Sequence, residues 1–63
     1  MHILKKAALS HFRAEKQKAE ANLEVYLKNP AGIGEHPDLV EEVIKLVKAI
    51  AEAQESIEYL EGK

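Results

Sequence analysis

The ten residues at positions 29–38, with the sequence NPAGIGEHPD, contain both prolines and two of the three glycines of the 63-residue chain. Proline and glycine end helices and form turns. The runs on either side carry apolar residues at helical spacing and are free of proline and glycine as far as position 62. The segment therefore predicts that one long helix ends, that the chain turns, and that a second helix of similar length begins.

We expect a single domain of residues 1–63, with an all-α fold that is an antiparallel two-helix hairpin. The spacing predicts a first helix over about 3–28, a turn over 29–36 and a second helix over about 37–60.

The residues at the predicted turn suggest how each helix ends or begins. Asn29 can end the first helix, and Pro37 suits the first position of the second, where its missing N–H group is not needed. His36 would then be the N-cap of the second helix, and Gly62 would lie just past its end.

One stripe of residues along each predicted helix is spaced three and four apart and should face the other helix. Lys16 interrupts the first stripe, and its aliphatic stem can lie along the interface while the ammonium group reaches water. Leu4, Ala8 and Leu27 widen that stripe at its ends. The predicted hairpin core is Leu9, Phe12, Ala19, Leu23, Tyr26, Leu39, Val43, Leu46, Ile50, Ala53, Ile57 and Leu60.

A second apolar row runs beside the stripe of the second helix and consists of Val40, Ile44, Val47 and Ala51. Together the two rows are wider than one partner helix can cover. A chain of 63 residues without cysteine also lacks disulfide support, so oligomerisation is the remaining common means of stabilising it. The row therefore predicts a homo-oligomer interface, with a dimer that forms a four-helix bundle favoured and higher assemblies also open.

Charge and hydropathy restrict the classes of partner. The net charge of −2 argues against a general nucleic-acid-binding protein. Residues 1–28 carry a charge of +3 and residues 29–63 a charge of −5, so two antiparallel helices would attract each other. No apolar run is long enough to cross a membrane or to form a signal peptide, so we expect no membrane partner and a location in the cytoplasm.

The tripeptide His36-Pro37-Asp38 is the sharpest short motif, and it supports two interpretations. One is the start of the second helix. The other is a partner contact, because the tripeptide resembles the signature loop of J-domains, the co-chaperones that stimulate heat-shock ATPases. We find no catalytic constellation, no metal-ligand spacing and no cofactor motif, and we expect none of these sites.

The run from Val25 to Asp38, VYLKNPAGIGEHPD, resembles a group of short uncharacterised helical proteins of marine tailed phages, of the cyanophage type. The resemblance implies a phage origin and a location in the host cell, but it assigns no functional residue. The leading expectation is a non-enzymatic interaction protein that acts through a helical surface on a host protein. The alternatives are a minor component of the virion or its assembly, a small-ligand sequestering oligomer, and a J-domain-like chaperone regulator.

Overall fold

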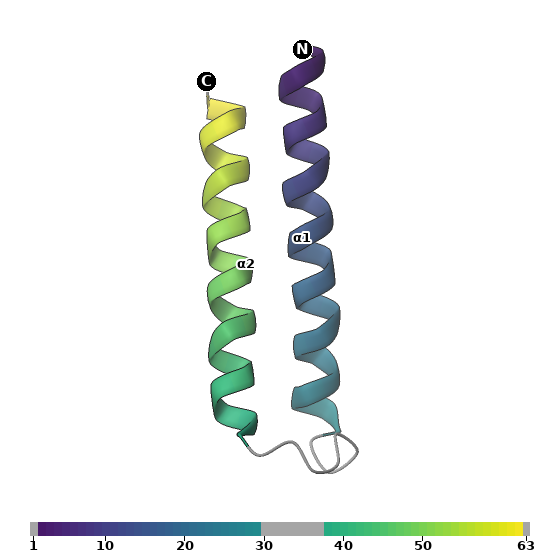
Figure 1. The fold of residues 1–63 in the computed structure, drawn as a ribbon, viewed down its shortest axis with the longest axis vertical. Coiled ribbons are helices and arrows are strands. Elements are labelled where there is room, and N and C mark those ends of the chain that lie inside the picture. Colours follow the sequence, from purple (N-terminus) through teal and green to yellow (C-terminus); the bar gives the residue numbers. More distant parts are fainter. Residues whose placement is uncertain (1, 30–37, 63) are drawn as a thin grey trace.

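Two α-helices lie side by side and antiparallel (Figure 1). The computed structural model describes residues 2–29 and 38–62. Helix α1 spans Ile3–Lys28 and helix α2 spans Leu39–Gly62, and they form a rod of 45 × 15 × 14 Å. The predicted all-α hairpin is confirmed, whereas the positions expected to form most of the turn, 30–36, lie outside the described residues.

The start of α2 differs from the prediction. Asp38, rather than His36, is the N-cap: its Oδ1 accepts a hydrogen bond from the Glu41 N–H at 2.9 Å, and its carbonyl accepts one from the Glu42 N–H at 3.2 Å. Aspartate caps helices well because its short carboxylate satisfies an N–H group that has no partner within the helix. The helix therefore begins at Leu39, two residues after the expected start at Pro37.

The other helix ends also depend on local hydrogen bonds. His2 is the N-cap of α1, and its Nδ1 accepts a hydrogen bond from the Leu4 N–H at 3.1 Å. Asn29 ends α1, with its N–H donating to the Val25 carbonyl at 2.9 Å. Gly62, expected just past the end of α2, instead forms its last residue.

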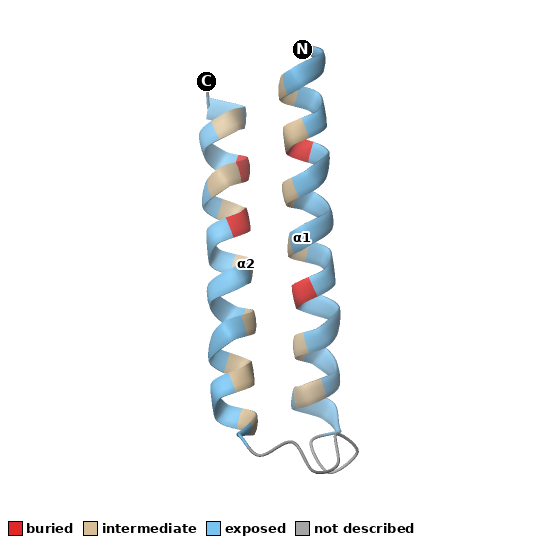
Figure 2. Cartoon of the chain, viewed as in Figure 1, coloured by how far each residue is buried: buried red, intermediate tan, exposed pale blue. Residues whose placement is uncertain are grey.

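The seam between the helices contains all twelve residues predicted for the hairpin core, each of them buried or half-buried. The most deeply buried side chains are Leu9, Ala19, Ala53 and Ile57 (Figure 2). Leu9, Ala53 and Ile57 lie in the half of the hairpin nearer the chain ends, whereas Ala19 lies just past the middle of α1 toward the turn. In the turn half beyond Ala19, formed by residues 20–28 and 39–50, the described seam residues are only half-buried. Burial is therefore unequal along the rod.

The prediction that Leu4 and Leu27 widen the buried stripe of α1 was wrong. Leu4 is 73% exposed and Leu27 is 64% exposed, whereas Ala8 is half-buried as expected. One helix covers only a limited width of its neighbour, because side chains away from the line of contact turn toward solvent.

The cap at Asp38 gives a first prediction. Asp38→Ala is expected to lower the free energy of unfolding by about 1 kcal/mol, because the Glu41 N–H loses its acceptor. Asp38→Asn is the matched control, since its amide oxygen still accepts this bond. Urea denaturation followed by far-ultraviolet circular dichroism measures both. An Asn variant as unstable as the Ala variant would assign the effect to the charge of Asp38 near the helix terminus instead of the cap.

Candidate functional site

Three hydrogen-bonded polar side chains lie at the middle of the seam, one on α1 and two on α2. The Lys16 Nζ donates a hydrogen bond to the Gln54 Oε1 at 2.6 Å, and the Gln54 Nε2 donates to the Glu58 Oε2 at 2.8 Å. The ammonium group of Lys16, expected to reach water, is thus held by α2. The bond from Lys16 links the two helices, and the bond between Gln54 and Glu58 lies within α2 and orients the Gln54 amide.

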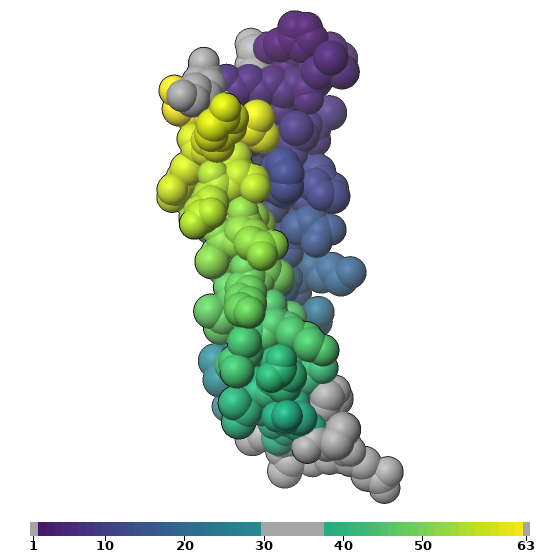
Figure 3. Space-filling view, turned by 60° about the vertical axis from the view of Figure 1, so that its left-hand side comes forward, coloured from purple at the N-terminus to yellow at the C-terminus, as the bar shows by residue number. Residues whose placement is uncertain are grey.

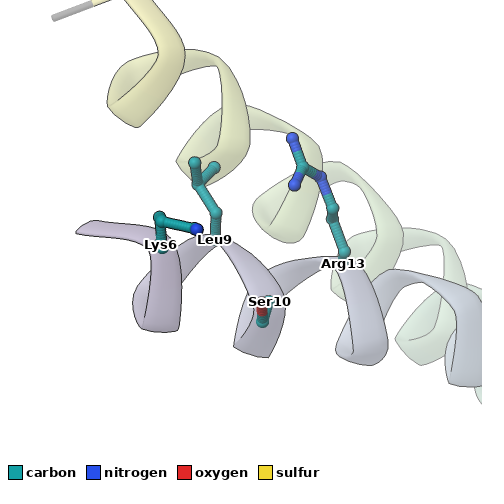
Figure 4. A pocket seen from close by; sticks show the side chains of 4 residues that line it. All are labelled: Lys6, Leu9, Ser10 and Arg13. Carbon is teal, nitrogen blue, oxygen red and sulfur yellow. The ribbon is translucent and has the colours of Figure 1, made fainter. Parts of the chain in front are cut away.

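A shallow pocket lies near the chain ends and is lined by Lys6, Leu9, Ser10 and Arg13. Leu9 and Arg13 extend from α1 toward α2 (Figure 4), and Arg13 forms an ion pair with Glu61. Ser10 supplies the hydroxyl of this pocket. The neighbouring His11 packs edge-on against Phe12, with ring centroids 5.1 Å apart, and within the described residues it forms no hydrogen bond to Ser10. His11 is therefore not placed as a base for the Ser10 hydroxyl.

The remaining chemical groups do not converge on a site in the described part of the chain. The Ser56 hydroxyl donates to the Glu52 carbonyl within α2 at 2.9 Å. Residues 2–29 and 38–62 contain no group of three His, Cys, Asp or Glu residues placed to hold a metal ion. Neither α1 nor α2 has an apolar stretch of the length that a membrane span requires.

One residue of the tripeptide predicted as a partner contact, Asp38, lies within the described residues. His36 and Pro37 lie outside the described residues. Asp38 is exposed, and its carboxylate is engaged in the cap of α2. The cap agrees with the interpretation of the tripeptide as a helix start, with Asp38 as the capping residue.

The apolar row of α2, formed by Val40, Ile44, Val47 and Ala51, lies outside the seam. The exposed fractions are 70% for Val40, 42% for Ile44 and 49% for Val47, and Ala51 is exposed as well. Helical geometry places the row about a third of a turn from the line of contact with α1, so one neighbouring helix does not cover it. Figure 3 shows that α2 occupies one face of the molecule, with α1 behind it.

A groove adjoins this row in the turn half of the hairpin. Leu23, Leu27 and Ile50 line it together with charged residues of α1, and its volume is about 520 Å³. Ile50 lies three residues after Val47 on α2, so the two side chains are neighbours on the helix surface. The row and the groove thus form one apolar surface, and the contribution of Leu27 was missed because the spacing of α1 placed Leu27 in the seam.

Two charged residues flank the row on one side. Glu41 and Lys48 are exposed and are one heptad apart on α2. The Glu–Lys spacing of four would pair Glu41 with Lys45, but Lys45 lies 3.6 Å from the carboxylate of Glu42 instead. Within the described residues, neither the Glu41 carboxylate nor the Lys48 ammonium forms an ion pair.

Comparison of the chain with protein-family models, curated proteins and solved structures finds no match. The candidate site is therefore defined by the geometry of the chain itself, as an apolar surface on the outer side of α2.

Proposed function

We propose that the chain is a non-enzymatic interaction protein that binds a protein partner through the apolar row of α2. The observation that supports this proposal is the exposure of Val40, Ile44 and Val47 on a hairpin whose buried core consists, among the described residues, of Leu9, Ala19, Ala53 and Ile57. Contiguous exposed apolar residues on a small protein are typical of interaction surfaces.

The same surface supports a proposal about assembly. Each helix of a four-helix bundle contacts two neighbours, and α2 has two apolar faces about a third of a turn apart. One face meets α1, and the other is the exposed row. A homo-oligomer, with the dimer as its smallest form, would cover the second face. A host-cell or virion protein is the other class of partner, in keeping with the phage resemblance of residues 25–38.

Photo-crosslinking tests whether the row binds protein. A benzophenone amino acid at Val47 is expected to give crosslinked products in the concentrated purified protein or in a host lysate. The matched control carries the same amino acid at Asn22, which is exposed on α1 outside the row. Equal yields at both positions, or no product from Val47 in either sample, would contradict the proposed function.

A further inference from the structure

We propose that the α2 row binds the α2 row of a second copy of this chain, with the two helices antiparallel about a two-fold axis that passes between Ile44 and Val47. This inference rests on the proposed function, because it names the occupant of the same surface. It adds the identity of the partner, the direction of its helix and the register.

The spacing of the row is that of a short interface between two packed helices. Val40, Ile44, Val47 and Ala51 are four, three and four residues apart, which is the alternation of a coiled-coil interface. In the antiparallel register, Ile44 lies against Val47 of the second copy, and Val40 lies against Ala51 of the second copy. The larger side chain thus faces the smaller one at each end, which favours close packing.

The charges beside the row are complementary only when the helices are antiparallel. In that arrangement, the side of the row that carries Glu41 and Lys48 faces the same side of the row of the second copy, and the order of the residues is reversed. Glu41 then lies beside Lys48 of the second copy, and Lys48 lies beside Glu41 of the second copy. A parallel arrangement would place this side against Val43 and Ile50, which carry no charge. The two side chains that form no ion pair in the described part of one chain thus gain a partner in the dimer.

The proposed contact also covers the half of the hairpin that packs less well. The row spans positions 40–51, and the seam residues beside it are only half-buried. The groove lined by Leu23, Leu27 and Ile50 opens on the same half. A second copy would therefore bury apolar surface in the turn half of each chain, while the halves that contain Leu9 and Ile57 would extend outward on opposite sides.

Charge reversal tests the direction of the helices. At low salt, either Glu41→Lys or Lys48→Glu alone is expected to raise the dimer Kd by about tenfold, because each creates two like-charge contacts in the antiparallel dimer. The double variant restores both pairs with their signs exchanged and is expected to bring the Kd back to within about threefold. Sedimentation equilibrium gives each Kd, and circular dichroism confirms that each variant is helical. Val25→Glu, on an exposed site of α1, is the matched control and should leave the Kd unchanged.

Cysteine crosslinking tests the register separately, since the natural chain has no cysteine. A mixture of the Ile44→Cys and Val47→Cys variants is expected to form mixed disulfides faster than either variant forms disulfides with itself. Faster self-pairing of each variant, or a double charge variant as weak as the single ones, would overturn the antiparallel register.

The outcomes also separate this inference from the proposed function. A chain that remains monomeric at high concentration, while the photo-crosslinker at Val47 captures a different protein, would overturn the self-association and leave the interaction surface intact. A Val47 crosslinker that captures neither a second copy nor another protein would overturn both.

Discussion

Leu9→Ala is expected to lower the free energy of unfolding by about 2–4 kcal/mol, which is a large part of the stability of so small a domain. Leu9 is 2% exposed and is the largest fully buried side chain of the described residues. Its removal loses apolar contact with α2 and leaves a cavity, because the neighbouring side chains relax only partly. Chemical denaturation at a fixed protein concentration measures the loss, since self-association would otherwise shift the midpoint.

Two control variants allow this prediction to be tested even if Leu9→Ala does not fold. Leu4→Ala makes the same chemical change at a side chain that is 73% exposed, and it should cost less than about 0.5 kcal/mol. Leu9→Met preserves the volume and should cost less than about 1.5 kcal/mol. Equal losses from Leu9→Ala and Leu4→Ala would show that the seam near the chain ends is not the stable part of the hairpin.

Ala19→Leu is expected to destabilise the hairpin by about 1–3 kcal/mol through overpacking. Ala19 of α1 and Ala53 of α2 are both buried, so the buried positions there are filled by small side chains with little room for a larger one. A leucine at position 19 would require the helices to separate, which would also strain the bond between Lys16 and Gln54.

The matched control for this variant is Ala14→Leu, which places the same side chain at an exposed position of α1. Alanine and leucine are both strong helix formers, so the control should change the free energy of unfolding by less than about 0.5 kcal/mol. Thermal or urea unfolding measures both variants. A stable Ala19→Leu protein would mean that the seam has room for three more carbon atoms at Ala19, contrary to what its burial predicts.

Most of the hairpin could be predicted because helical periodicity and turn residues are local signals. The seam residues follow from spacing alone, and the first helix spans the expected 3–28. The start of α2 was misplaced because Pro37 suits a first helical position, whereas the hydrogen bond that sets the start comes from Asp38. Leu27 was misplaced because spacing does not show how much width a neighbouring helix covers.

The candidate site could be predicted only in outline. The row from Val40 to Ala51 is visible in the sequence, because its residues repeat beside the seam. The groove at Ile50, and the finding that Glu41 and Lys48 form no ion pair with residues 2–29 or 38–62, depend on side-chain placement in three dimensions. Spacing permits Lys45 to pair with either Glu41 or Glu42, and only the structure shows the pairing with Glu42.

The burial of Leu9 and Ile57 near the chain ends has a consequence for folding kinetics. A helical hairpin that packed best beside its turn could close progressively through contacts between residues near each other in sequence. Here the best-buried contacts join distant residues, and the ion pair between Arg13 and Glu61 spans 48 positions. Most of the chain must therefore be brought together as one large loop before these contacts form, and the entropy lost in closing that loop precedes the gain from packing. Such an order favours an all-or-none transition over gradual closure from the turn.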